Sequence, residues 1–524
     1  MSRDLIIKVD NFVNNITNAS FETEFAFAKS LIRKYYKTEL DRFKIIISDA
    51  LNRNWDVIIT VDSDFDGYSS ARAMYHFIRL LGVPQNKIRF VPLNGLHTTD
   101  KPIDANNSLV LISDTGYGNV KMSSNNHKLI WIDHHEISGL ELMKARSSMG
   151  SRGVFINTSR STEEYIQGLS CGAFLYIFLS EVIEQLGLTS ENEQYMIKSF
   201  DDLCRQESLL SLISDVMKIE NYSGLMKGIY DSKKTPLYEM LKFKFDYNNK
   251  NYFKRHIAKI NNLIRMDRFD ILERILTDEI THDMLMEIER VEDDKKIIIN
   301  RYLSTQSPRY SSIYENRVTI AFYELPLSNN KVMRNFKGFM ASINTPNEGV
   351  YIIFSYYKSN GQVFLSCRNN INIDVKKYIA SSNVPIVTMG GHLGSFGVVL
   401  LEEDFESFRR AMGELPERIE IGRLNVLGTF INYCNLEPEF KTLSNLAIFN
   451  EFYSDEVRIV FDKNDFFNII EEPRRTLYEL ELKGSKKVGV VSFAVNTIKD
   501  RIIAKPQLKK SLYDLDYIDI IEFK

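Results

Sequence analysis

The stretch VIITVDSDFDG, residues 57–67, decides how the rest of the sequence is interpreted. Its apolar, mostly β-branched residues predict a buried strand, which leads directly into Asp62, Asp64 and Asp66 and then into Gly67. Three like charges this close together are costly to bury unless a cation neutralises them. The stretch therefore indicates half of a metal site or, as the alternative, a strand-to-helix turn in which one aspartate caps the next helix.

Length and composition describe an ordinary globular chain with several domains. The chain has 524 residues, 44% of them hydrophobic and 26% charged, and this length predicts about three or four domains of ~100–200 residues. A net charge of −3 excludes a globally basic nucleic-acid binder but leaves a basic face open. Four widely spaced cysteines support neither a disulfide framework nor a thiolate zinc site. Without a signal peptide or a run of ~20 apolar residues, we expect a cytoplasmic protein with no membrane contact.

Several short apolar runs predict a parallel sheet covered by helices on both faces. They are WDVIITV, SLVLISD, KLIWID and GVFIN, between residues 55 and 157. Three of them end in Asp62, in Asp114 and in Asp133-His134-His135. Because ligands bind at the carboxyl ends of parallel strands, we expect these groups to meet in one crevice. Carboxylates with imidazole suit Mn²⁺ or Mg²⁺, and their number suggests two ions.

The order of these motifs resembles the DHH phosphoesterase superfamily. The pattern DxDxDG is followed by a strand ending in Asp114 and then by Asp133-His134-His135. Further along the chain, GLSCGAFLYIFLSEVIEQLG from Gly168 and LLSLISDVMKIEN from Leu209 are similar to later family motifs, and TMGGHLGSFGVVL contains a GGH signature. The resemblance covers residues 55–412.

The resemblance implies a set of functional residues. By this resemblance, six residues bind the metal ions, and Asp114 is the bridging carboxylate. The six are Asp62, Asp64, Asp66, Asp114, His134 and Asp215. It also implies that His135 orients a ligand or donates to phosphate, and that Arg368 and the segment Gly390-Gly391-His392 bind substrate phosphate. Asp114, His135 and His392 are thus the catalytic candidates. Many family members have a histidine at the position of Thr60, so this chain departs from the pattern, and whether Asp62 compensates stays open.

The same patterns divide the chain into five regions. We expect a helical lead-in over residues 1–50, a catalytic domain of the DHH type over 51–225, and a helical connector over 226–312 whose charged residues form a solvated face or line a groove. A smaller α/β DHH-associated domain is expected over 313–415. Alternating strand-like patterns over 416–524 predict a β-rich domain, and its position matches the oligonucleotide-binding barrel of RecJ-type exonucleases.

Within the superfamily, length and motif form favour the RecJ type. This resemblance implies a hydrolase that uses two Mn²⁺ or Mg²⁺ ions to activate water and that degrades single-stranded DNA in the 5′-to-3′ direction. It also implies a role in DNA repair or recombination, with a single-strand-binding protein or a helicase as partner. Two alternatives remain open. One is a phosphodiesterase for cyclic dinucleotides or short oligonucleotides, and the other is a non-catalytic scaffold with the same fold.

Overall fold

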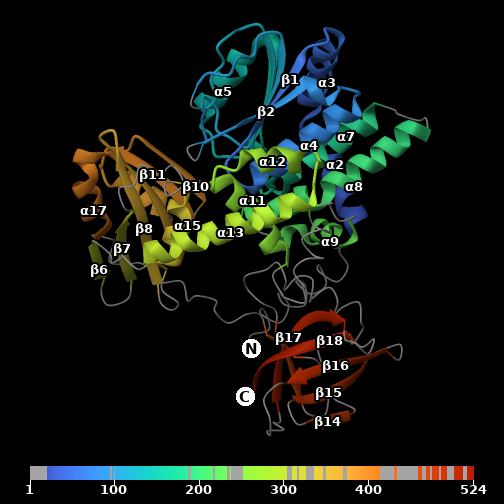
Figure 1. Ribbon diagram of the computed structural model, residues 1–524, viewed down its shortest axis with the longest axis vertical. Coiled ribbons are helices and arrows are strands. Elements are labelled where there is room, and N and C mark those ends of the chain that lie inside the picture. The colour runs from blue at the N-terminus through green and yellow to red at the C-terminus, as the bar shows by residue number, and fades with distance from the viewer. Residues whose placement is uncertain are drawn as a thin grey trace.

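The computed structural model describes three sheets and the helices that pack on them (Figure 1). The described residues are 20–94, 97–99, 101–186, 191–215, 217, 219–232, 237, 252–303, 310–314, 318–325, 335–345, 350–369, 375–392, 394–413, 430–432, 458–462, 468–472, 475–482, 486–492, 501–510 and 516–523.

The first sheet is parallel throughout, in the order β2-β1-β3-β4-β5. Its strands are β1 (Asp56–Val61), β2 (Ile88–Pro92), β3 (Ser108–Ser113), β4 (His127–Asp133) and β5 (Gly153–Asn157). Their near-continuous apolar character follows from burial on both faces. The predicted fold class is confirmed, and the carboxyl ends of β1, β3 and β4 lie at one edge.

Helices cover both faces of this sheet. One core joins Val57, Ile59, Leu109 and Leu111 to the helices α3, α4 and α7, and a second core joins Ile58, Val110 and Trp131 to α5. The bounds are α2 (Phe21–Tyr35), α3 (Lys37–Asn52), α4 (Phe65–Leu80), η1 (Gln85–Lys87), α5 (Gly139–Met149), η2 (Gly150–Arg152), η3 (Thr158–Arg160), α6 (Glu164–Gln167), α7 (Cys171–Gln185) and α8 (Glu191–Ser214).

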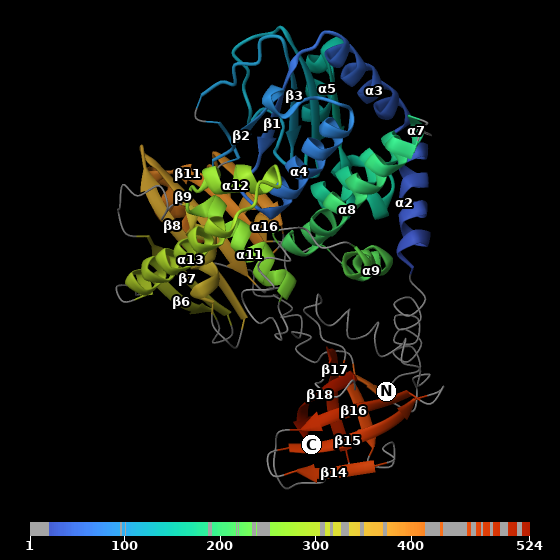
Figure 2. The same ribbon diagram turned by 45° about the vertical axis from the view of Figure 1, so that its right-hand side comes forward.

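A group of helices then leads away from the first sheet (Figures 1 and 2). They are η4 (Ile219–Tyr222), α9 (Ser223–Asp231), α11 (Tyr252–Arg265), α12 (Phe269–Leu276) and α13 (His282–Leu303). The last three lie within the connector expected over residues 226–312, whereas η4 and the start of α9 precede it. The buried Arg72 of α4 fixes their position. Its Nε lies 2.9 Å from Glu207 Oε2 of α8, its Nη1 donates to the Ile275 carbonyl at 2.8 Å, and its Nη2 lies 2.7 Å from Asp278 Oδ1. The connector is therefore anchored to the helices that flank the first sheet.

The second sheet has the order β10-β11-β9-β8-β7-β6, in which β7 and β8 are parallel and the other pairs antiparallel. Its strands are β6 (Tyr310–Tyr314), β7 (Val318–Glu324), β8 (Val350–Ser359), β9 (Gln362–Asn369), β10 (Thr388–His392) and β11 (Ser395–Leu401). The accompanying helices are α15 (Lys337–Ile343), α16 (Val375–Ser381), η5 (Glu402–Asp404) and α17 (Phe405–Gly413). One face of the sheet packs on α16 and α17, and α15 packs on the other face against β8 and β9.

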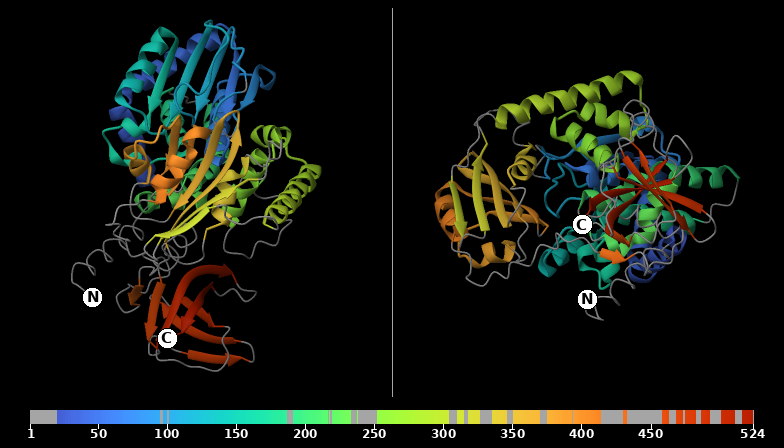
Figure 3. Two further views of the ribbon diagram at one scale, coloured as in Figure 1. Left: turned by 90° about the vertical axis from the view of Figure 1, so that its left-hand side faces the viewer. Right: turned by 90° about the horizontal axis from the view of Figure 1, so that it is seen from below.

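The C-terminal strands form a third sheet, as Figures 2 and 3 show. Its order is β12-β13-β17-β18-β16-β15-β14, with bounds β12 (Phe430–Asn432), β13 (Arg458–Asp462), β14 (Asn468–Glu472), β15 (Arg475–Leu482), β16 (Lys486–Ser492), β17 (Arg501–Lys510) and β18 (Asp516–Phe523). The β-rich character of this region is confirmed. Its likeness to an oligonucleotide-binding barrel stays a prediction, and the expected boundary at residue 416 lies outside the described residues.

No helix in the described part of the chain combines the length and apolar character that a membrane span needs.

Candidate metal centre and interdomain cleft

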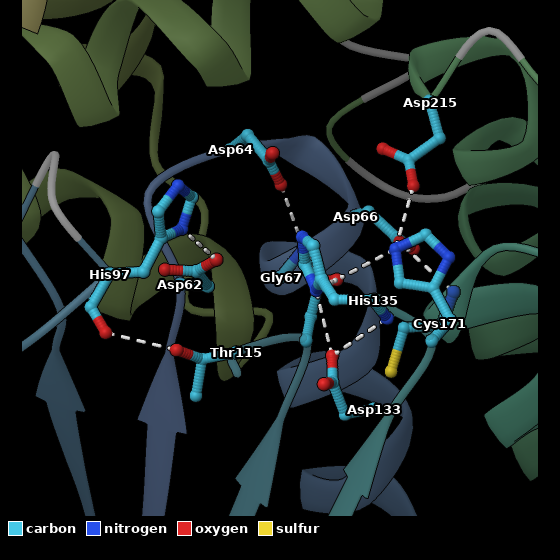
Figure 4. Close-up of polar contacts among 12 residues, drawn as sticks. Asp62, Asp64, Asp66, Gly67, His97, Thr115, Asp133, His135, Cys171 and Asp215 are labelled. Atoms are coloured by element: carbon cyan, nitrogen blue, oxygen red, sulfur yellow. Dashed lines mark hydrogen bonds and ion pairs between the residues drawn. The ribbon is translucent and has the colours of Figure 1, made fainter. Parts of the chain in front are cut away.

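The turn from β1 into α4 carries the first acidic group. Asp64 is the N-cap of α4 and accepts a hydrogen bond from the Gly67 amide at 3.1 Å. A β-carbon at Gly67 would lie 2.4 Å from Asp62 Cβ, so only glycine fits this turn. The helix-capping alternative is thus correct for Asp64, whose carboxylate still faces the crevice (Figure 4).

Asp66 is held by a second helix. Its two carboxylate oxygens accept hydrogen bonds from the backbone amides of Cys171, at 2.8 Å, and Gly172, at 2.7 Å. These amides open α7, where free N–H groups and the helix dipole favour a negative charge. A side chain at Gly172 would collide with Ser69 Oγ, at 2.2 Å from the added β-carbon. The small residues at the start of α7 therefore let the helix approach Asp66.

His134 brings the acidic groups together. Its Nε2 lies 3.1 Å from Asp215 Oδ2, 3.2 Å from Asp114 Oδ1 and 3.7 Å from Asp66 Oδ2. Among the described residues, two sets have ligand atoms close enough for one ion. They are Asp66, His134 and Asp215, and Asp114, His134 and His135. The structure therefore places five of the sequence-predicted residues around one point at the edge of the first sheet.

The electrostatics of this cluster suit a divalent cation. Burial, reinforced by the charges of neighbouring aspartates, raises the pKa of Asp64 and raises the pKa values of Asp66 and Asp114 well above their usual range. Burial alone would lower the pKa of His134, but its hydrogen bond to Asp215 and the acidic charges outweigh burial and raise it. Asp114 Oδ1 is buried and has no hydrogen-bond donor. These residues fit a metal centre because a bound cation would replace the protons that the cluster otherwise retains.

Two imidazoles beside the cluster are each oriented by a buried aspartate. His135 Nδ1 lies 2.7 Å from Asp133 Oδ1, and His97 Nδ1 lies 2.6 Å from Asp62 Oδ2. The two rings are 6.1 Å apart between centroids, and both residues line the same cleft. The carboxylate of Asp62 raises the pKa of His97 to about 9.

Asp62 thus lies outside both candidate ligand sets and contacts His97 instead. Thr60 is fully buried, and its hydroxyl donates to the Leu111 carbonyl at 3.5 Å. His97 follows β2, the strand beside β1, and Thr115 Oγ1 donates to its carbonyl at 2.9 Å (Figure 4). Sequence reasoning missed His97 because the segment NGLHTTD matches no motif. Its place after a strand at the same sheet edge was the available signal.

Asp64 and His135, at the edge of the cluster, line a cleft of about 910 Å³ whose opposite wall is the second sheet. Arg368 lines this cleft as expected, and so do Arg265 of α11 and Lys337 of α15, which sequence analysis did not single out. Burial lowers the pKa of Arg265 to about 10 and that of Lys337 to about 8, and in both residues the charge of Arg368 adds to this effect. Arg368 Nε donates to Ser342 Oγ at 3.0 Å. Three cations therefore gather opposite the carboxylates.

The GGH segment is the end of strand β10. Gly390 and Gly391 line the cleft, and Lys376 Nζ donates to the Gly391 carbonyl at 2.6 Å. Gly391 has a φ of 118°, and a β-carbon there would lie 2.7 Å from Phe396 Cα, so the hairpin from β10 to β11 requires glycine. His392 ends β10, but its side chain lies outside the described part of the structure, so its expected phosphate contact stays a prediction.

The fold is similar to that of solved RecJ structures. RecJ from Thermus thermophilus in complex with Mn²⁺ is 15% identical, with 91% of this chain and 70% of that chain covered and a TM-score of 0.56. The same protein in complex with Mg²⁺ gives a TM-score of 0.48 at 15% identity, covering 91% and 68% of the two chains. An exonuclease RecJ bound to manganese gives 0.43 at 14% identity, covering 70% and 92%.

The first similarity shows that the chain has a RecJ-like fold. No family model matches the sequence, and no curated protein does.

Proposed function

From the RecJ-like fold and the buried carboxylate–imidazole cluster, we propose that the protein is a metal-dependent phosphodiesterase that removes nucleotides from an end of single-stranded nucleic acid, with DNA degraded from 5′ to 3′. The observation that carries the proposal is a single cleft lined by Arg368 on one side and, on the other, by Asp64 and by His135, which belongs to the same candidate ligand set as Asp114 and His134. A negatively charged phosphodiester fits between a cationic wall and a metal-binding wall.

The residues of the first wall would hold the ions. Asp66, His134 and Asp215 would hold one divalent ion. Asp114, which shares the other candidate set with His134 and His135, would contribute to a second ion together with Asp64. When bound, Mn²⁺ or Mg²⁺ supplies Lewis acidity that lowers the pKa of water and neutralises phosphate charge. The similarity to the RecJ structure with Mn²⁺ supports a divalent ion of this kind.

The chain's own groups then position the substrate. The guanidinium of Arg368 can make paired hydrogen bonds to phosphate oxygens, and Arg265 and Lys337 add positive charge beside it. The bond from Asp133 fixes the ring of His135, and the bond from Asp62 fixes that of His97, so each imidazole keeps its Nε2 for the cleft. These rings would hold or donate protons to phosphate oxygens.

Digestion of strands labelled at the 5′ or the 3′ end, in Mn²⁺, tests the substrate class, with a cyclic dinucleotide and a duplex as controls. Stepwise loss of nucleotides from the 5′ end of the single strand, with the duplex spared, is the expected result. Hydrolysis of the cyclic dinucleotide alone would instead identify a small-nucleotide phosphodiesterase. A purified chain that hydrolyses neither would be a non-catalytic scaffold.

A further inference from the structure

Three helices that carry site residues pack against one another: α4, α8 and α11 (Figure 2). Asp64 and Asp66 lie at the start of α4. Asp215 directly follows α8, and Arg265 is the last residue of α11. The register of these helices against one another therefore decides how the metal-binding residues and the cleft cation are placed.

Glu207 of α8 joins all three helices at one buried point. Its Oε2 accepts a hydrogen bond from the Tyr68 hydroxyl at 2.9 Å and lies 2.9 Å from Arg72 Nε, so this oxygen binds α4. Its Oε1 lies 3.0 Å from His256 Nε2 of α11. The side chains of Glu207, Arg72 and His256 are at most 2% exposed. One buried carboxylate thus fixes α8 against both α4 and α11.

The Glu207 carboxylate is charged in the folded protein. Burial alone would raise its pKa, but the Arg72 guanidinium and the hydrogen bonds from His256 and Tyr68 outweigh burial and lower the pKa of Glu207. Because a carboxylate only accepts hydrogen bonds, His256 Nε2 carries the proton that it shares with Glu207. Hydrogen bonds to a charged acceptor are the shorter and stronger kind, so both oxygens hold their helices firmly.

Phe65 connects this cluster to the acidic turn. It stands between Asp64 and Asp66 in the sequence, and its side chain is fully buried. Its ring lies edge-on to the His256 ring, with centroids 5.9 Å apart, and 5.7 Å from the Tyr68 ring. The groups that donate to Glu207 therefore pack directly on the turn that carries the first aspartates.

The helices carry the register on to their far ends. Asp215 lies about two turns beyond Glu207, or about 12 Å along α8, and the backbone bonding of the helix continues into it. Arg265 lies about 14 Å beyond His256 along α11. The Arg265 carbonyl accepts a hydrogen bond at 3.1 Å from Asn335 Nδ2, in the segment before α15. A shift at Glu207 would therefore move both Asp215 and Arg265.

Packing of the three helices does not depend on these charges. Phe77 of α4, Leu210 of α8 and Ile260 of α11 belong to one buried apolar core. A buried ion pair stabilises a fold no better than well-packed apolar side chains do. Apolar contacts are not directional, however, whereas hydrogen bonds fix distance and angle. The cluster around Glu207 therefore contributes register more than stability.

We propose that Glu207 is a positioning residue of the metal centre, which holds α4, α8 and α11 in the one register that brings Asp66 and Asp215 to the same ion and Arg265 into the cleft. Glu207 itself belongs to neither candidate ligand set and does not line the cleft. This inference rests on the proposed function and adds a residue outside the site on which metal affinity depends.

Isothermal titration of the full-length chain with Mn²⁺, without substrate, tests the proposal independently of activity. Glu207→Leu should raise the apparent Kd for Mn²⁺ at least about 10-fold, the lower end of what groups that orient metal ligands contribute. Glu207→Gln should recover most of this loss, because its oxygen can accept from α4 and its amide group can pair with the other tautomer of His256.

Glu24→Leu is the matched control. Glu24 of α2 also joins helices through its carboxylate, since it accepts from the Tyr165 hydroxyl at 2.7 Å and from the Gly224 amide. None of these helices ends in a site residue. Glu24→Leu should therefore lower Tm, measured by calorimetry, and leave the Kd for Mn²⁺ unchanged.

His256→Leu tests the second oxygen of Glu207 in a variant that keeps the carboxylate paired with Arg72. It should raise the Kd for Mn²⁺ about 2- to 12-fold, the range of one hydrogen bond, and His256→Gln, whose amide can donate to Glu207, should restore it. This pair decides the proposal where Glu207→Leu does not fold.

Wild-type Kd in folded Glu207→Leu or in His256→Leu, or an equal rise of Kd in Glu24→Leu, would overturn the positioning role. Hydrolysis of a single strand that persists despite this result leaves the proposed function standing. A wild-type chain that binds Mn²⁺ but cleaves no strand overturns the proposed function alone, while the Kd values still decide the role of Glu207. A wild-type chain that binds no Mn²⁺ overturns both.

Discussion

The buried carboxylates should make the stability of the metal-free protein fall as pH rises, and Mn²⁺ should reverse this loss. The folded-state pKa values of Asp66 and Asp114 are raised, mainly by burial. From about pH 4 upward, the unfolded chain therefore loses protons that the folded chain keeps. Stability decreases with pH over this window until the folded-state pKa values are passed. Acidification from pH 7.5 to 5.5 should raise the Tm of the metal-free protein.

The loss of stability with pH and the stabilisation by Mn²⁺ both have expected magnitudes. Each proton that only the folded state retains costs about 1.4 kcal/mol per pH unit. Mn²⁺ at about 100 times its Kd should contribute about 2.7 kcal/mol. For a unit the size of the first-sheet domain, this corresponds to a Tm increase of about 5–10 °C.

Differential scanning calorimetry of wild type and Asp114→Asn, with Mn²⁺ or EDTA, checks these values. Asparagine tolerates the positive φ of 58° at this position. It removes one of the mutually repelling charges, so the metal-free variant should be more stable than metal-free wild type at pH 7.5. The variant should also lose most of the Mn²⁺ effect. Asp56→Asn, at the exposed start of β1, is the control and should behave as wild type. Equal Mn²⁺ stabilisation of Asp114→Asn and wild type would show that Asp114 does not bind the ion.

Three further predictions follow from single contacts. Arg368→Ala should lower kcat/KM on a single strand about 10- to 150-fold, which corresponds to the loss of hydrogen bonds to a charged group. Lys337→Ala should lower kcat/KM less, and steady-state kinetics measures both variants. Equal effects of the two substitutions would argue against paired contacts by the Arg368 guanidinium. Asp62→Asn should bring the pKa of His97 from about 9 back toward its ordinary value, measured by NMR titration of the ring, and an unchanged pKa would contradict their pairing. Gly67→Ala should lower stability by about 1–3 kcal/mol through overpacking, and denaturant unfolding that matches wild type would contradict the close approach to Asp62.

The fold and the centre of the site could be predicted because they depend on local patterns. Buried parallel strands have near-continuous apolar sequences, and the rule that ligands gather at their carboxyl ends placed Asp62, Asp114 and His134 at one edge. Asp215 could not be placed by that rule, since it follows a helix. The family resemblance supplied it, and the structure brings it to 3.1 Å from His134.

The remaining site residues depend on contacts between distant segments. Arg265 and Lys337 come from different helices, and nothing in their neighbouring residues indicates that they lie beside Arg368 in one cleft. His97 reaches Asp62 through a loop that follows the adjacent strand. Such information is fixed by tertiary packing and strand pairing, which a single sequence does not display.

Release of labelled nucleotides from a single-stranded DNA by the purified chain, with Mn²⁺ and with EDTA, tests the central claim most directly. We expect hydrolysis by wild type in Mn²⁺, none in EDTA, and none by Asp114→Asn in either condition, although the variant is folded. Hydrolysis by Asp114→Asn at the wild-type rate, or by wild type in EDTA, would contradict a metal centre at this cluster.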